Sequence, residues 1–216
     1  MSVSILDRTQ VLIEIDADTG RQHGETILAA IEAALSLAAV ALSDIEFLAC
    51  TVGPGSFTGL RVGIGSVKGL AFALNKPVVA VSSLDALAMN VLEDTMPICA
   101  MLDARRGELY AAWYTPCPGE IPQRVGEEMV ITPQALVNKI DGAVCFVGEG
   151  AATYEEYFKE QMAEKAHFAG STRNLIRAGA VGVIGLKKYE SGDSLGALTV
   201  MPRYLRSSYA EGVQFA

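Results

Sequence analysis

The sequence is poor in the residues that build most metal sites and nucleotide-binding loops. It has two histidines, His23 and His167, which form no H-x-x-x-H pair, and four cysteines, none of them in a C-x-x-C pair. Zinc sites are usually built from such pairs of ligands. No segment matches the G-x-x-x-x-G-K-[ST] loop or the G-x-G-x-x-G fingerprint that bind nucleotide phosphates. We therefore expect no metal and no cofactor.

Basic residues are also scarce. Lysine and arginine number 17 against 25 acidic residues, which gives a net charge of −8. Such a chain gains nothing from attraction to a phosphate backbone, so direct binding of nucleic acid by this chain alone is disfavoured. The N-terminus lacks the charged and apolar regions of a signal peptide. The apolar run 26–42 contains Glu32 and is shorter than the about 20 residues of a membrane span. We expect a cytoplasmic protein with free thiols.

Small and aliphatic residues are abundant, in strands that alternate with helices, which is typical of an α/β fold. The first expected elements are a hairpin of "VSILD" and "QVLIEID", a helix over 24–42, a strand over 47–52, a helix over 57–74, a strand over 77–83 and a helix over 84–91. A second series has two strands around a turn at 105–107, a strand over 143–150, and helices over 153–163 and 172–189. The repeated plan predicts a first lobe over 1–96, a second lobe over 97–198 and a tail over 199–216.

The most distinctive stretch is "GPGSFTGLRVGIGSVKG", residues 53–69. Projected at about 100° per residue, the helix over 57–74 has an apolar core face and an opposite face of mainly small residues. The core face holds Leu60, Ile64, Val67, Ala71 and Leu74. The opposite face holds Gly59, Val62, Gly63, Gly65, Ser66, Gly69, Leu70 and Ala73. Each glycine within a helix costs about 0.5–1 kcal/mol relative to alanine, so four of them need a reason.

Two reasons are open. Gly59-x-x-x-Gly63 and Gly65-x-x-x-Gly69 have the spacing that lets a second backbone approach closely, from the same chain or from a helix of another chain. The helix over 24–42 favours another chain, because its apolar residues cover far more than one surface stripe. The expected partner-binding residues are Ile27, Ile31, Leu35, Gly59, Val62, Gly63, Ser66, Gly69 and Leu70. A structural turn at Gly53, Pro54, Gly55 and Ser56 precedes them.

Two residues are candidates for chemistry. Asp103 follows an apolar strand, with Arg105 and Arg106 close by. A carboxylate at a strand end can hold a metal-bound nucleotide, and it is at least as often a turn residue that bonds its own backbone. Ser56 lies in G-P-G-S-F rather than in the G-x-S-x-G elbow of hydrolases, and it has no evident base. We expect no catalytic residue.

Three blocks resemble the TsaB (YeaZ) family: "TVGPGSFTGLRVGIGSVKGLAFAL", "LDARRGELYAAWY" and "PRYLRSSYA". The resemblance covers essentially the whole chain, and the first block is the most specific. It implies the two-lobed actin/Hsp70/sugar-kinase (ribonuclease H-like) fold with a degenerate second lobe, in which Asp103 would mark a vestigial nucleotide site. The family is also labelled glycoprotease-like, but the missing histidine pair argues against a peptidase role.

The resemblance also implies work within a complex. The chain would be a noncatalytic subunit that dimerises with TsaD and, with the ATPase TsaE, supports transfer of threonylcarbamoyl to N6 of adenosine 37 in tRNAs reading ANN codons. Helices of the first lobe would form this surface, which would support a homodimer when TsaD is absent, and tRNA would be contacted only indirectly. The alternatives are a nucleotide-binding phosphotransferase or ATPase of the same superfold, with Asp103 near the phosphates, and a self-associating scaffold.

The start of the chain departs from the family pattern. Family members usually begin with a strand such as I-L-A-I-D-T, whereas this chain begins within what would be the second strand, "SVSILD". The first strand of lobe one is thus apparently missing, and it would lie centrally in the sheet. We expect that sheet to be open beside residues 2–7 or rearranged, and open edges recruit strands from other chains.

Overall fold

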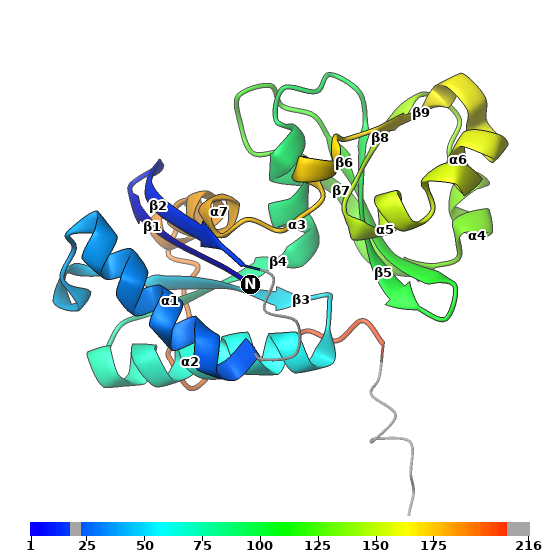
Figure 1. The fold of residues 1–216 in the computed structure, drawn as a ribbon. Helices are drawn as coiled ribbons and strands as arrows, with labels where there is room; N and C mark the ends of the chain where they lie inside the picture. Colours follow the sequence, from blue (N-terminus) through cyan, green and yellow to red (C-terminus); the bar gives the residue numbers. More distant parts are fainter. Residues whose placement is uncertain (18–22, 207–216) are drawn as a thin grey trace, which may run out of the picture. The chain divides into compact units, whose positions relative to one another are not determined.

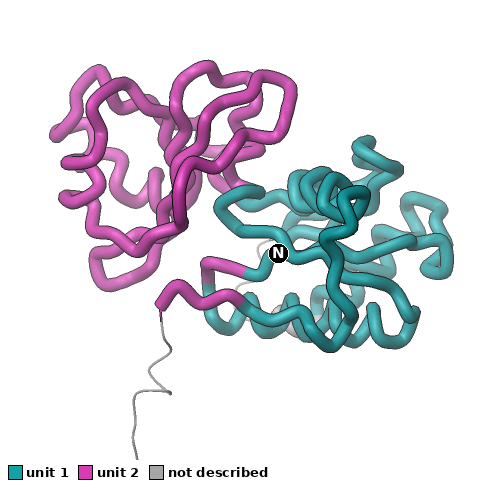
Figure 2. Tube along the Cα trace, turned by 180° about the vertical axis from the view of Figure 1, so that it is seen from behind, with its two compact units in different colours: residues 1–52, 56–86, 176–202 teal, residues 53–55, 87–175, 203–216 magenta. Residues whose placement is uncertain are grey.

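The structure is a computed structural model that describes residues 1–17 and 23–206, without the side chains of residues 23–25 (Figure 1). The side chain of His23 and the tail over 207–216, both interpreted from the sequence above, lie outside the described residues. The chain forms two compact units, each assembled from separate stretches (Figure 2). Unit 1 comprises residues 1–52, 56–86 and 176–202. Unit 2 comprises residues 53–55, 87–175 and the end of the chain from Arg203.

Among the described residues, unit 1 contains two separate two-stranded sheets. Strands β1 (Ser2–Asp7) and β2 (Gln10–Asp16) form an antiparallel hairpin, and β3 (Leu48–Gly53) pairs with β4 (Val78–Ser82). The helices are α1 (His23–Ala38), α2 (Phe57–Leu74), α3 (Ser83–Ala88, which ends in unit 2), α7 (Ala178–Glu190) and the short turn η1 (Leu42–Asp44). The expectation that a first strand is missing from this lobe stays a prediction.

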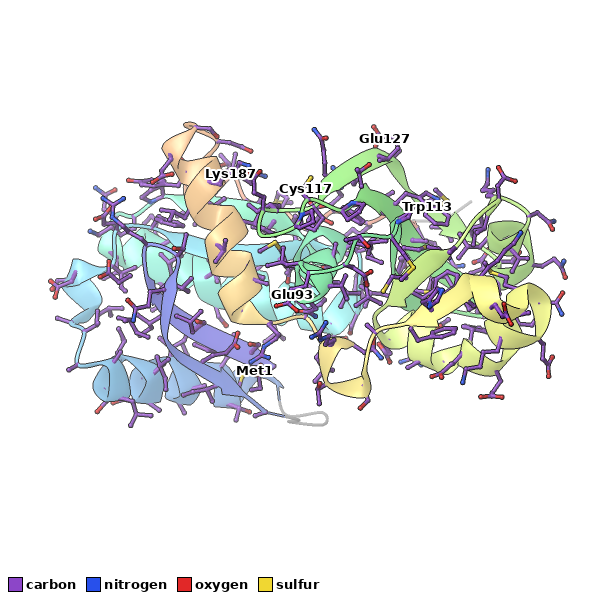
Figure 3. The ribbon with its side chains drawn as sticks, turned by 90° about the horizontal axis from the view of Figure 1, so that it is seen from above. Met1, Glu93, Trp113, Cys117, Glu127 and Lys187 are labelled. Atoms are coloured by element: carbon purple, nitrogen blue, oxygen red, sulfur yellow. The ribbon has the colours of Figure 1, made fainter. Side chains whose placement is uncertain are left out.

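Helix α7 joins the two sheets of unit 1 through glycines. It packs on β1 and β4, and Figures 1 and 3 show the β1–β2 hairpin between α1 and α7. A Cβ atom on Gly182 would lie 2.5 Å from Cδ1 of Leu6 on β1, and one on Gly185 would lie 2.7 Å from Cβ of Ala49 on β3. A side chain on Gly185 would overlap the fixed Cβ of Ala49, so α7 needs glycine there, whereas one on Gly182 would require the end of the Leu6 side chain to move.

Unit 2 is built on a five-stranded sheet in the order β7-β6-β5-β8-β9. Its strands are β5 (Ile98–Arg105), β6 (Glu108–Thr115), β7 (Gln123–Ile131), β8 (Val144–Val147) and β9 (Ala166–Phe168). The β5–β6 and β6–β7 pairs are antiparallel, and the β5–β8 and β8–β9 pairs are parallel. The remaining elements are α4 (Pro133–Val137), α5 (Glu149–Thr153), α6 (Glu155–Met162), η2 (Met89–Val91), η3 (Ala163–Lys165) and η4 (Ser171–Arg173).

The core of unit 2 lies between this sheet and α4 to α6. Phe146 of β8 stacks on Phe158 of α6 with ring centroids 4.6 Å apart, and both side chains are fully buried. Trp113 of β6, labelled in Figure 3, packs against the same cluster. Burying an aromatic side chain of this size contributes about 1.5–3 kcal/mol, so these rings hold the helices on the sheet.

Most of the expected elements are present, and several bounds need correction. The first helix ends at Ala38 rather than Leu42, and the last begins at Ala178 rather than at Thr172. Strands β7 and β9 and helix α4 were not expected. The lobes over 1–96 and 97–198 and the tail over 199–216 remain a proposal about the plan of the fold, since the compact units place α7 with β1 and β4.

Candidate partner-binding surface

The residues on either side of α2 define where the helix begins and ends. Strand β3 ends at Gly53, which has φ 124°, and α2 begins at Phe57, so the chain turns within three residues. The hydroxyl of Ser56 accepts a hydrogen bond from the backbone N–H of Gly59 at 3.3 Å, which caps the helix N-terminus. At the other end Asn75 takes a left-handed conformation with φ 53°. The turn residues therefore serve the start of the helix.

One face of α2 belongs to the core of unit 1. Leu60, Ile64 and Ala71 are buried in a cluster that also contains Val52 of β3 and Val78 of β4. The buried positions lie on the face that the sequence assigns to the core. By length and composition alone α2 could cross a membrane, but one such helix is weak evidence, and this one is fixed in a folded unit along this face.

The glycines on the other side of α2 have open space beside them. A Cβ atom added to Gly63, Gly65 or Gly69 would meet nothing within 4 Å, and one on Gly59 would make only an ordinary 3.5 Å contact with Ser56. This differs from α7, where glycine is required by packing. Close packing within the described chain therefore does not explain the glycines at these three positions of α2.

Helix α1 lies beside α2 and adds apolar side chains to the same surface. Eight of the nine expected partner-binding residues are half-buried, and Gly69 is exposed. The structure adds four large hydrophobic side chains that the sequence reading had not assigned to a surface. They are Leu28 (54% exposed), Leu37 (70%), Phe57 (38%) and Phe72 (68%). The helical projection could have found Phe72, because it falls outside the arc of the core residues of α2.

The two charged side chains of α2 make contacts within the chain. The ammonium group of Lys68 donates to the carbonyl oxygens of Leu198 at 3.1 Å and Val200 at 3.2 Å. Arg61 stacks over the ring of Phe57, with 3.9 Å between its Cζ atom and the ring centroid. The α1–α2 surface, as we call the exposed sides of these two helices, thus combines exposed hydrophobic side chains with the glycines of α2, and small residues of this kind let another helix approach closely.

Asp103 serves the β5–β6 turn. Its two carboxylate oxygens accept hydrogen bonds from the backbone N–H and the guanidinium group of Arg105, at 2.7 and 3.1 Å. Arg105, Arg106 and Gly107 all have left-handed φ angles, so the carboxylate stabilises a turn that only glycine adopts freely. A vestigial nucleotide site at Asp103 stays a prediction.

The thiols of Cys50 and Cys145 have raised pKa values. Burial raises the pKa of the Cys50 thiol to about 12, and burial together with a hydrogen bond to Asp94 raises the pKa of Cys145 to about 12. Both thiols are therefore protonated at neutral pH and are poor nucleophiles. Within residues 1–17 and 23–206, no three His, Cys, Asp or Glu side chains gather in a way that could hold a metal ion.

Comparisons with known proteins agree on one family. The profile of the family described as "TsaD: tRNA N6-adenosine threonylcarbamoyltransferase" matches residues 15–212. The tRNA threonylcarbamoyladenosine biosynthesis protein TsaB of Bacillus subtilis is 28% identical over 213 residues, 98% of this chain and 91% of that protein. The TsaB of Haemophilus influenzae is 31% identical over 197 residues, 87% of this chain and 81% of that protein. The structure of YeaZ from Pseudomonas aeruginosa superposes with a TM-score of 0.80 at 31% identity, over 94% of this chain and 93% of that chain.

The fold and these likenesses define an α/β protein of the TsaD-related class, with the actin/Hsp70-like fold that the sequence predicts. Within that class, the chain belongs to the TsaB (YeaZ) family. The resemblance read from the sequence blocks is thereby confirmed.

Proposed function

We propose that the chain acts in tRNA threonylcarbamoyladenosine biosynthesis as a noncatalytic subunit that pairs with a TsaD subunit through the α1–α2 surface. The observation that carries this proposal is the open space beside Gly63, Gly65 and Gly69, because these glycines weaken α2 and have no packing partner in the described chain. A second helix packed against them would explain why these positions are glycine.

The finer parts of the proposed role rest on the resemblance to the family. Together with TsaD and the ATPase TsaE, the subunit supports transfer of threonylcarbamoyl to N6 of adenosine 37 in tRNAs reading ANN codons. It works in the cytoplasm and forms a homodimer through the same surface when TsaD is absent. Its net charge of −8 is consistent with tRNA being bound through the partner. The proposal agrees with the names of the TsaB relatives, which are biosynthesis proteins for this modification.

Replacing a glycine of α2 by a large residue tests the proposed pairing. We expect Gly63→Leu and Gly69→Leu to weaken association with purified TsaD about ten- to a hundredfold, because overpacking a close contact costs about 1–3 kcal/mol. Sedimentation velocity measures the association, and circular dichroism checks that the melting temperature is kept. In a symmetric homodimer the substitution occurs twice, so the effect there is larger.

Gly142→Leu is the matched control, since Gly142 of unit 2 also has nothing within 4 Å of an added Cβ. It leaves association unchanged. The pairing proposal fails if Gly63→Leu binds TsaD as the unsubstituted chain does. Modification of tRNA by this chain in the absence of TsaD contradicts the noncatalytic role independently of the interface.

A further inference from the structure

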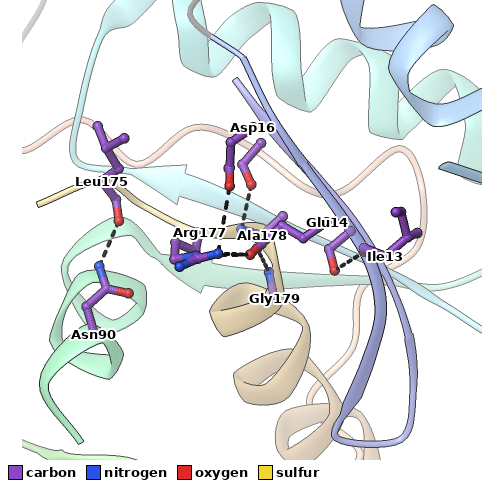
Figure 4. A network of polar contacts seen from close by, with 10 residues as sticks. Ile13, Glu14, Asp16, Asn90, Leu175, Arg177, Ala178 and Gly179 are labelled. Atoms are coloured by element: carbon purple, nitrogen blue, oxygen red, sulfur yellow. Dashed lines mark hydrogen bonds and ion pairs between the residues drawn. The ribbon is translucent and has the colours of Figure 1, made fainter. Parts of the chain in front are cut away.

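The chain passes from unit 2 to unit 1 between Leu175 and Ile176, and hydrogen bonds hold it just before and just after this point (Figure 4). On the unit 2 side, the side-chain amide of Asn90 donates to the carbonyl oxygens of Arg173 and Leu175, both at 2.7 Å. An asparagine amide has two N–H hydrogens, and here each has its own carbonyl. One side chain thus holds the backbone at two nearby positions.

The residue between those two carbonyls is held as well. The side-chain oxygen of Asn174 accepts a hydrogen bond from the backbone N–H of Gly148 at 2.8 Å. Gly148 is buried, with φ 115°, and an added Cβ would lie 2.2 Å from the carbonyl oxygen of Met101. This anchor is therefore rigid. Residues 173–175 follow the surface of unit 2 because three side-chain hydrogen bonds keep them there.

A second set of contacts holds the chain on the unit 1 side. Arg177 donates to one carboxylate oxygen of Glu14 through Nε at 2.9 Å and Nη2 at 2.7 Å. The other oxygen accepts from the backbone N–H of Gly179 at 2.6 Å, and the hydroxyl of Ser2 accepts from Ala178 at 2.9 Å. The start of α7 is thus capped by residues of β1 and β2, and the charged pair makes these bonds strong.

We propose that Asn90 is a latch which, together with Glu14, confines backbone rotation at this crossing to Ile176. Ile176 is the one residue between the two sets of contacts. Release of Asn90 frees the carbonyl groups of Arg173 and Leu175 and leaves the segment 173–175 held by the Asn174 bond to Gly148 alone, so the segment opens more often. The cap on α7 stays in place because it depends on other residues. This proposal concerns the crossing alone and does not depend on the proposed function.

Limited trypsin digestion of the full chain tests the latch. Trypsin cuts after Arg173, whose side chain is exposed but whose carbonyl oxygen is held by Asn90, so cleavage requires the latch to open. Because cleavage follows the population of the open form, we expect Asn90→Ala to speed it about tenfold or more at Arg173. Asn90→Asp, which keeps the size of the side chain and removes both N–H donors, has the same effect. Cleavage after the exposed Lys187 of α7 is unchanged.

Leu175→Ala is the control within the segment, because this side chain is 65% exposed. It leaves cleavage at Arg173 at the rate of the unsubstituted chain. A rise at Lys187 in parallel with Arg173 would mean that the whole fold had loosened, and it would overturn the proposal. An effect of Asn90→Ala without an effect of Asn90→Asp would also overturn it, since packing rather than hydrogen bonding would then hold the segment.

Discussion

Glycine has two different roles in two helices of this protein. On α7, Gly185 faces Cβ of Ala49 so closely that no side chain fits. On α2, Gly65 faces open space. The residue type is the same, and only the neighbouring atoms distinguish a glycine needed for packing from one with open space beside it.

Replacing glycine by alanine should therefore have opposite effects on the free energy of unfolding in the two helices. Gly185→Ala should lower the free energy of unfolding by about 1–3 kcal/mol, because the Cβ of Ala49 cannot rotate away from the added methyl group. Gly65→Ala should raise it by about 0.5–1 kcal/mol, because alanine is the better helix former and nothing obstructs it. Urea unfolding of the isolated chain measures both. Equal losses of stability at the two sites would show that Gly65 is also packed within the chain.

Among helices and strands, the bounds are predicted best where the residues of the element itself determine them. Helix α2 has the predicted bounds, 57–74, because Ser56 caps its start and its apolar residues repeat with helical spacing. The hairpin of β1 and β2 also has the predicted turn at Arg8 and Thr9. The α1–α2 surface could be predicted in part, because both helices are more apolar than a single buried face requires.

The bounds of an element are predicted poorly where residues far away in the sequence determine them. The last helix begins six residues late because the turn η4 ends at Arg173, Asn90 binds the carbonyl oxygen of Leu175, and Glu14 caps the helix at Gly179. Strand β7 is polar and exposed over most of its length, so it shows no alternation of apolar residues. The first helix stops early at Ala39, which has φ 53° and no glycine or proline signal.

Lys68 binds an irregular segment near the end of the described chain, and this contact leads to a prediction. Its bonds to the carbonyl oxygens of Leu198 and Val200 hold the segment 195–201 beside α2, and Leu195 in turn bridges Val78 of β4. Lys68→Met should speed hydrogen exchange of the Leu195 amide several-fold, because the segment opens more often without this support. Lys187→Met, at an exposed position of α7, is the control. Unchanged exchange in Lys68→Met would mean that the burial of Val200 alone holds the segment.

The net charge of the whole chain disfavours binding of tRNA by the isolated protein. A charge of −8 opposes approach to a nucleic acid, so the isolated chain should show no measurable tRNA binding by fluorescence anisotropy at about 0.15 M salt. Added TsaD should bring the chain into a tRNA complex that also contains TsaD. TsaD alone is the reference. Binding by the isolated chain that weakens steeply with salt would contradict this and reveal a basic site of its own.

The discontinuous make-up of unit 1 has a consequence during synthesis on the ribosome. Residues 1–52 and 56–86 emerge first, but α7, which joins the two sheets, lies in the last stretch, 176–202. At about 5–20 residues per second, translation of the intervening chain takes roughly 5–20 seconds. During that interval α2 can already pack on β3 and β4, but the sheet faces that α7 covers, on β1 and β4, have no helix against them. Unit 1 can therefore be completed only after the last stretch of the chain has been translated, although most of its residues are made first.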